Sequence, residues 1–175
     1  WLQNCSNVQV FGVTDRNTTA GDTAVIEGSS VGCSITGVTA YNCGGHCASI
    51  SSGSGTTGAA PVNCHITDVY SESQGECIAA ITAQTSTNKP TNCTITNAKG
   101  KNCGRVTPSE GFALVNTTNC KIQGSIYDTN GNMTHAVAER GAGPTLNTFE
   151  IESWVQGSSG FFSMTSRWPS AHSVI

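Results

Sequence analysis

Charged side chains are scarce in this 175-residue chain: they make up 11% of it, and the formal net charge is -3. A nucleic-acid-binding protein needs a basic surface to neutralise phosphates, so the composition argues against nucleic acid as a partner. The chain also lacks any run of about eighteen apolar residues, which argues against insertion into a membrane. Aromatic residues are few, at 6%.

Helical periodicity and familiar catalytic motifs are missing as well. No segment has an apolar stripe with a period of 3.6 residues, so we expect no long helix. The sequence contains no G-x-S-x-G, no phosphate-binding loop and no HExxH, and we therefore expect no cofactor and find no support for a serine hydrolase, a nucleotide-dependent enzyme or a zincin. Abundant instead are glycine, at 20 residues, and serine, threonine and asparagine, whose hydroxyl and amide groups suit sugars.

Five of the nine cysteines open similar phrases, and this repeat is the main signal in the sequence. The phrases are NCSNVQVFGV, GCSITGVTAY, NCHITDVYSE, NCTITNAKGK and NCKIQGSIYD, beginning at residues 4, 32, 63, 92 and 119. The cysteines follow one another at intervals of 28, 31, 29 and 27 residues, and in four phrases an isoleucine stands two positions after the cysteine. Cysteine and isoleucine therefore point to the same side of a strand.

A second, weaker phrase recurs later in each unit, as in TAVIE at 23–27 and CASIS at 47–51. Units of about 29 residues with two short strands are too short to add a helix, so we predict an all-β fold, a right-handed parallel β-helix of about six coils of 27–31 residues. We assign residues 1–165 to the coils and 166–175 to a C-terminal cap or inter-chain segment. The chain has no initiator Met or leader, and we expect it to be part of a longer protein.

In such a coil a repeated residue stacks at the strand spacing of roughly 4.8 Å, so the cysteines form an interior column. We favour buried reduced thiols, because a free cysteine behaves as a small apolar residue; some disulfides are the alternative. A zinc site is the third reading, since Cys43, His46 and Cys47 lie close in sequence. A fourth ligand is not evident, and Cys103 stands at the same offset in its unit as Cys43 does, so we predict no metal site.

The N-C-x-I phrases, the Gly-rich corners and the low charge resemble the pectin-lyase-like superfamily of right-handed parallel β-helices, in particular bacteriophage tailspikes and tail fibres. The resemblance covers roughly residues 4–165 and is one of architecture. It implies a homotrimer that binds bacterial surface polysaccharide, and a chain that folds in bacterial cytoplasm and is carried on a virion tail, with secretion as the alternative.

Residues at equal offset from the repeat cysteines should lie above one another. Eight positions after the cysteine the column reads Tyr41, Glu72, Lys101 and Asp128. The alternating charges predict a surface salt-bridge ladder. As a functional alternative, Glu72 and Asp128 stand roughly 9.6 Å apart by twice the strand spacing, near the separation of the two carboxylates in inverting glycosidases. Tyr41 would then stack on a sugar and Lys101 would contact the substrate.

The segment 104–111 lengthens a turn and brings Arg105 and Glu110 into a projecting loop, where we place two further candidate substrate-binding residues. Glu76 and His65 are weaker catalytic candidates, for which a solvated surface position is the simpler interpretation.

Three functions remain open on the sequence alone. The first is a tailspike segment that recognises and cleaves bacterial polysaccharide as a hydrolase or lyase. The second is a non-catalytic, receptor-binding rod of a trimeric fibre, and the third is a secreted pectate-lyase-like enzyme or adhesin.

Overall fold

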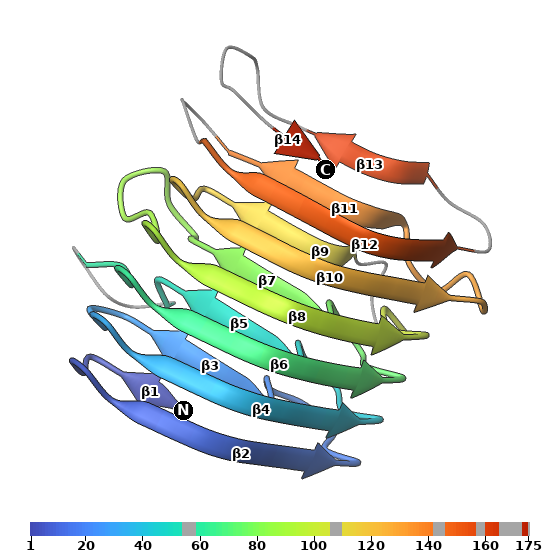
Figure 1. The fold of residues 1–175 in the computed structure, drawn as a ribbon, viewed down its shortest axis with the longest axis horizontal. Coiled ribbons are helices and arrows are strands. Elements are labelled where there is room, and N and C mark those ends of the chain that lie inside the picture. The colour runs from blue at the N-terminus through green and yellow to red at the C-terminus, as the bar shows by residue number, and fades with distance from the viewer. Residues whose placement is uncertain (54–58, 106–109, 142–145, 157–159, 165–172, 175) are drawn as a thin grey trace.

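Residues 1–53, 59–105, 110–141, 146–156, 160–164 and 173–174 are described in a computed structural model of the chain. Strands are the only extended regular element among them, and every strand pair is parallel. They form two seven-stranded sheets, which face each other across the core (Figure 1). The prediction of an all-β right-handed parallel β-helix is confirmed, with about five turns.

One sheet consists of the odd-numbered, mostly short strands, and the other of the even-numbered, mostly long ones. The short-strand sheet contains β1 (Leu2–Gln3), β3 (Ala24–Glu27), β5 (Ala48–Ser51), β7 (Ala79–Thr82), β9 (Glu110–Val115), β11 (His135–Arg140) and β13 (Gly160–Met164). The long-strand sheet contains β2 (Gln9–Arg16), β4 (Ser34–Tyr41), β6 (His65–Glu72), β8 (Thr94–Lys101), β10 (Lys121–Asp128), β12 (Thr148–Gln156) and β14 (Ser173–Val174).

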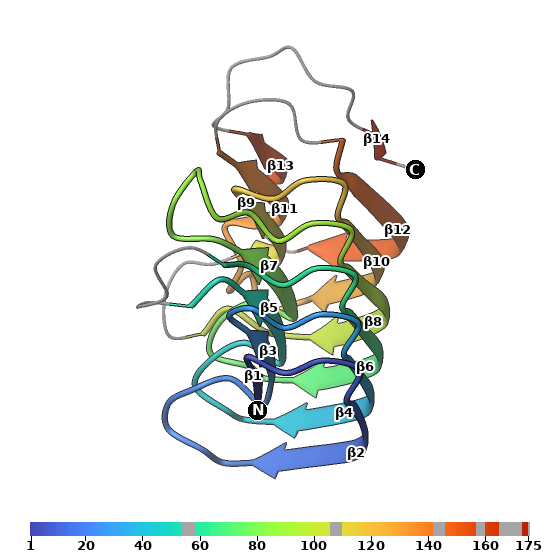
Figure 2. The ribbon, with the colours of Figure 1, turned by 90° about the vertical axis from the view of Figure 1, so that its left-hand side faces the viewer.

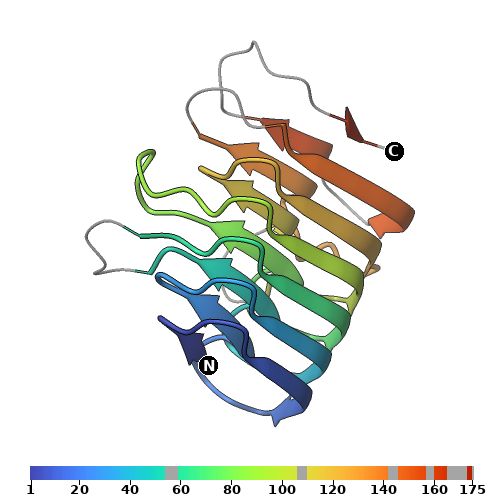
Figure 3. The ribbon, with the colours of Figure 1, turned by 60° about the vertical axis from the view of Figure 1, so that its left-hand side comes forward.

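Each coil runs along a long strand, turns a corner, crosses a short strand and returns to the next coil (Figures 2 and 3). The returning segments also touch in register, through single bridges that link Ser6, Val31, Val62, Thr91 and Thr118. The sheets and these bridges together close the wall of the solenoid around one core.

Isoleucine columns fill that core because side chains alternate between inside and outside along a strand. In the long-strand sheet Ile35, Ile66, Ile95 and Ile122 are in register and are almost completely buried. Ile26, Ile50, Ile81 and Leu114 form the matching column in the short-strand sheet. Each such side chain contributes about 1.5–3 kcal/mol by leaving water.

The predicted burial of the repeat cysteines is confirmed, with one error in the alignment. All nine cysteines are free thiols, and all but Cys5 are buried. Cys5 does not start the column, since the backbone bond from Ser34 N to Val8 O matches the one from His65 N to Cys33 O. Val8 therefore holds the first place of the column that continues through Cys33, and Asn147, which faces Cys120 in the next coil, holds the last.

The long strands bend in the middle, at residues with a left-handed backbone. Gly12, Gly37, Asp68 and Asn97 occupy this bend, with φ of 70°, 77°, 57° and 50°. Glycine, asparagine and aspartate tolerate that conformation better than other residues. Asn97 Nδ2 donates to Asp68 Oδ1 at 2.8 Å and joins two coils at the bend.

The C-terminal assignment is only partly covered. β14 pairs with β12 and so adds to the long-strand sheet, whereas residues 165–172 lie outside the described part. The boundary at 165 stays a prediction. Over the described residues, no helix is long and apolar enough to cross a bilayer.

Candidate functional site

Three members of the predicted surface ladder are in register. Tyr41 lies beside Glu72, and Glu72 beside Lys101. Lys101 Nζ is 3.2 Å from Glu72 Oε1, and the two side chains are 52% and 36% exposed. An ion pair with this exposure contributes about 0–1 kcal/mol. This part of the salt-bridge prediction is confirmed.

Asp128 is not part of that ladder, and the alignment that placed it there is wrong. β10 lacks the bend residue: Ile122 faces Ile95, but Gly124 already faces Ala98, so Tyr127 faces Lys101. Asp128 is fully buried, and its carboxylate accepts hydrogen bonds from the backbone of Asn132 and Met133 at 3.1 and 2.9 Å. It holds a turn, and the carboxylate pair proposed with Glu72 loses its common surface.

The Tyr41 ring already contacts two neighbouring side chains. The Arg16 guanidinium lies 4.2 Å from the centre of the ring, a distance at which cation and ring attract each other. The neighbouring Tyr70 ring is 5.9 Å away and tilted by 56°. Tyr70 is the more exposed of the two tyrosines, and the sequence reasoning missed it although it stands two residues before Glu72.

Arg105 and Glu110 differ in exposure. Arg105 is exposed, and its Nε donates to the Ser73 carbonyl at 2.6 Å. Glu110 opens β9, is only 5% exposed and pairs with Arg140 of β11. The expectation that Glu110 projects from the loop is wrong, since it is buried under an ion pair; residues 106–109 of that loop lie outside the described residues.

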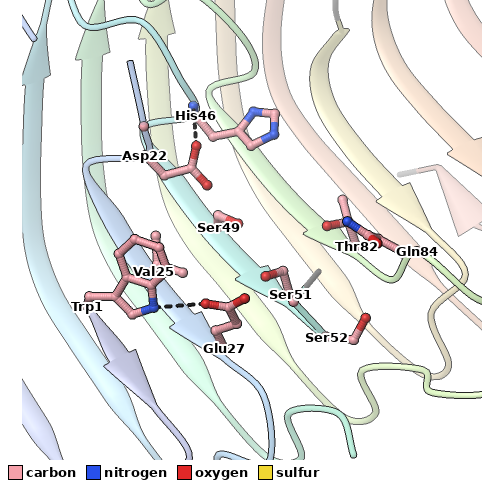
Figure 4. Close-up of a pocket in the computed structure, with 12 residues that line it drawn as sticks. Trp1, Asp22, Val25, Glu27, His46, Ser49, Ser51, Ser52, Thr82 and Gln84 are labelled. Carbon is pink, nitrogen blue, oxygen red and sulfur yellow. Dashed lines mark hydrogen bonds between the residues drawn. The ribbon is translucent and has the colours of Figure 1, made fainter. Parts of the chain in front are cut away.

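A groove of about 320 Å³ lies on the outer face of the short-strand sheet (Figure 4). Its floor comes from outward residues of β3, β5 and β7, which alternate with the buried isoleucines. The lining residues are Trp1, Gly21, Asp22, Val25, Glu27, His46, Ser49, Ser51, Ser52, Gly53, Thr82 and Gln84. Hydroxyl groups, two carboxylates and one indole therefore face the same space.

Small side chains shape this face. Val25, Ser49 and Ala80 stand in register on β3, β5 and β7, and little of each remains exposed. At one end of the groove, Trp1 Nε1 donates to Glu27 Oε2 at 2.9 Å, which holds the exposed indole against the carboxylate (Figure 4).

Asp22, His46 and Glu76 gather at the corner before these strands. His46 Nε2 is 3.2 Å from Glu76 Oε2, and Asp22 Oδ1 accepts the backbone N–H of His46 at 2.9 Å. Corner glycines allow this approach: a Cβ on Gly75 would lie 2.0 Å from the Gly44 carbonyl oxygen. The coils can therefore stack closely enough for three consecutive coils to contribute one residue each.

This cluster is a hydrogen-bonded group, and its geometry disfavours a metal. One possible ligand atom from each of Asp22, His46 and Glu76 lies within 4.8 Å of the others. A metal on one nitrogen of a neutral imidazole requires the proton on the other nitrogen. His46 Nδ1, however, accepts the backbone N–H of Cys77 at 3.1 Å, so the proton is on Nε2 and is donated to Glu76.

The zinc reading of Cys43, His46 and Cys47 has no support in the geometry. Cys43 and Cys47 are fully buried in the core, whereas His46 faces the groove. The remaining minor candidate, His65, is exposed, and its Nδ1 lies 2.9 Å from Thr94 Oγ1.

Comparison with known proteins gives no family for the chain: no protein-family model, curated protein or solved structure matches it. The fold itself defines the class, a parallel β-solenoid. Its function must be argued from the surface.

Proposed function

We propose that this β-solenoid binds polysaccharide in the groove on its short-strand sheet. The observation that carries the proposal is the set of groups that line the groove: Ser49, Ser51 and Thr82 hydroxyls on a rigid floor, carboxylates of Asp22 and Glu27, and the exposed indole of Trp1. Carboxylates accept strong hydrogen bonds from sugar hydroxyls, and an indole offers an apolar face to a sugar ring.

The dimensions suit a chain-like ligand. The floor spans β3, β5 and β7, which is roughly 10 Å by twice the strand spacing, or about two pyranose rings. The floor residues are fixed by the parallel pairing of the strands and by the isoleucine column beneath them. A preformed site of this kind loses little conformational freedom when a ligand binds.

As biological setting we propose the tailspike interpretation: a homotrimer on a virion tail whose partner is bacterial surface polysaccharide. The support for this setting is the solenoid fold together with the polar, weakly charged composition. Light scattering on the full-length protein tests the trimer, and a monomer would contradict the setting without touching the groove.

Blocking the groove is the sharpest test of its role. Ser49→Phe places a large ring on the floor, and we expect it to weaken binding to a responsive bacterial polysaccharide at least about tenfold, because the ring occupies the ligand's space. Thr39→Phe is the matched control, since Thr39 faces outward from β4 in register with Tyr70. If Thr39→Phe abolished binding while Ser49→Phe did not, the site would lie on the long-strand sheet.

Whether the bound chain is also cut is a separate question with its own assay. Asp22 and Glu76 offer carboxylate oxygens within 4.8 Å of each other beside the groove, so they replace Glu72 and Asp128 as the carboxylates to test. New reducing ends that disappear in both Asp22→Asn and Glu76→Gln, while binding persists, would identify a hydrolase. Binding without new reducing ends would identify a receptor-binding rod.

A second candidate function is contact with other chains through the long-strand sheet. Three large side chains are exposed on its outer face, Phe11, Tyr70 and Tyr127. Aromatic residues of this kind are enriched where proteins meet. Phe11→Ser and Tyr70→Ser should dissociate the oligomer if this sheet forms the interface, and should leave its mass unchanged otherwise.

A further inference from the structure

The groove is lined by acidic side chains and by no lysine or arginine. Asp22 and Glu27 line it, and Glu76 lies next to it through His46. The His46 proton is on Nε2 and is directed at Glu76, so the imidazole adds no positive charge in this arrangement.

On the opposite sheet, basic side chains gather on one half of the strands. Arg16, Lys99 and Lys101 lie there beside a single partner, Glu72, on the same half of the strands. None of the described lysine and arginine side chains lines the groove, and Arg140, which lies on the same sheet, is paired with Glu110. Charge of one sign in a concave site determines which ligands can enter it.

We propose that the groove selects glycans without carboxylate, sulfate or phosphate groups, and that free amino groups on the sugar strengthen binding. This inference rests on the proposed function and names the substrate class of the same site. An anionic sugar would place its charge against Asp22 and Glu27 with no cationic side chain to pair with it, and like charges facing each other are strongly unfavourable. A hydroxyl or ammonium group would instead donate to those carboxylates.

This selectivity also limits the cleavage reactions that the groove can support. A polysaccharide lyase removes the C5 proton of a uronic acid or of its ester and expels the glycosidic oxygen. A groove that excludes free uronates cannot support that elimination on acidic chains, and an esterified uronate is the only lyase substrate that this selectivity admits. Cleavage of a glycan without uronate units in this groove is therefore hydrolytic.

The experiment compares ligands that share a backbone and differ only in charge. The first series contains β-1,4-linked oligomers of glucose, glucosamine and glucuronate, and the second contains methyl-esterified and de-esterified oligogalacturonate. Neutral bacterial polysaccharides and their acidic counterparts extend the panel. Binding to the full chain is measured by calorimetry at low and high salt.

We expect the uncharged or amino form to bind at least about tenfold more tightly than the acidic form of the same backbone. High salt should reduce that ratio, because it screens the repulsion. Asp22→Asn and Glu27→Gln should each reduce the ratio as well. Glu150→Gln is the matched control: it removes the same charge from the long-strand sheet, where Glu150 pairs with Lys121 at 2.6 Å, and it should leave the ratio unchanged.

The outcomes separate this inference from the proposed function. Acidic oligomers that bind as tightly as the neutral ones would overturn the selectivity and leave polysaccharide binding intact. A ratio that neither Asp22→Asn nor Glu27→Gln changes would also overturn it. If no ligand of the panel bound, the proposed function would be refuted, and the selectivity with it.

Discussion

Ion pairs lie on the outer faces of both sheets, and the pair Glu72–Lys101 on one face differs in burial from the pair Glu110–Arg140 on the other. On the long-strand sheet, Glu72 and Lys101 meet in water, with about a third and a half of their side chains exposed. On the short-strand sheet, the Glu110 side chain is 7% exposed where it pairs with Arg140. The Glu72–Lys101 pair therefore lies at the surface, whereas Arg140 neutralises a carboxylate that is almost fully buried.

This difference extends to the faces as a whole. The long-strand sheet presents charged and aromatic side chains outward, whereas the short-strand sheet has a floor of small residues such as Ser49, Ala80 and Ala113. Small residues leave room for a groove over β3 to β7. Over β9 and β11 the Glu110–Arg140 pair lies on the same sheet. The short-strand sheet is therefore open to a ligand over β3 to β7 and is covered by an ion pair over β9 and β11.

The largest effect we expect is alkaline destabilisation through the buried thiols on both sides. Burial raises the pKa of Cys77, which packs against Ala80 and Ala113 of the short-strand sheet, to about 12, and the neighbouring Cys120 thiol raises that of Cys93 to about 12. The unfolded thiols ionise near pH 9, so the stabilisation is complete below pH 9 and is lost as the pH rises toward 12. Each thiol then costs about 2 kcal/mol between pH 9 and 10.5.

Urea unfolding at a series of pH values measures this loss. Cys77→Ala and Cys93→Ala should each make the unfolding free energy fall less steeply above pH 9, and comparing them divides the effect between the two faces. A free energy of unfolding that stayed constant from pH 9 to 10.5 would contradict the burial of these two thiols.

The next largest effect concerns the corner that builds the candidate site. Gly75→Ala should lower the free energy of unfolding by about 3 kcal/mol, because the new Cβ would lie 2.0 Å from the Gly44 carbonyl oxygen and backbone must move. Gly12→Ala is the control on the long-strand sheet. There φ is +70° but no atom lies within 4 Å, so only backbone strain remains, about 1 kcal/mol. Equal losses in the two variants would show that the corner is not tightly stacked.

Removing Arg140 should have a smaller effect of about 2 kcal/mol. Arg140→Met keeps much of the side-chain volume but leaves the buried Glu110 carboxylate without its partner. The double variant with Glu110→Gln should recover part of the loss, because the buried charge is then gone too. If the double variant were less stable than Arg140→Met alone, the cost would come from packing and not from the charge.

The residues show which parts of this structure the sequence could predict. The isoleucine and cysteine columns were predictable because each is a repeated letter in a repeated phrase, and period-two alternation assigns them to the interior. The alignment assigned Cys5 to the column incorrectly. The first coil is shorter, and Val8 occupies the position that a cysteine has in the later coils. The alignment also placed Asp128 beside Lys101 incorrectly. β10 lacks one bend residue, so every later residue of this strand is shifted by one position relative to β8.

The groove was missed for a different reason. Asp22, His46 and Glu76 share no residue type, so no column of equal letters marks them. They do stand two or three positions before the second phrase of each unit, at Ala24, Ala48 and Ala79. An alignment on that phrase, rather than on the cysteines, would have placed the three residues on adjacent coils. Their contact further depends on corner glycines, whose role appears only when the coils are stacked.

The smallest effect belongs to the exposed pair. Lys101→Met should change the free energy of unfolding by less than about 1 kcal/mol, because Glu72 remains solvated and Tyr70 still donates to it at 3.4 Å. Parallel urea titrations of Lys101→Met and Arg140→Met compare the two ion pairs directly. If Lys101→Met were as costly as Arg140→Met, burial would not explain the difference between the faces, and the long-strand ladder would have to be a structural element in its own right.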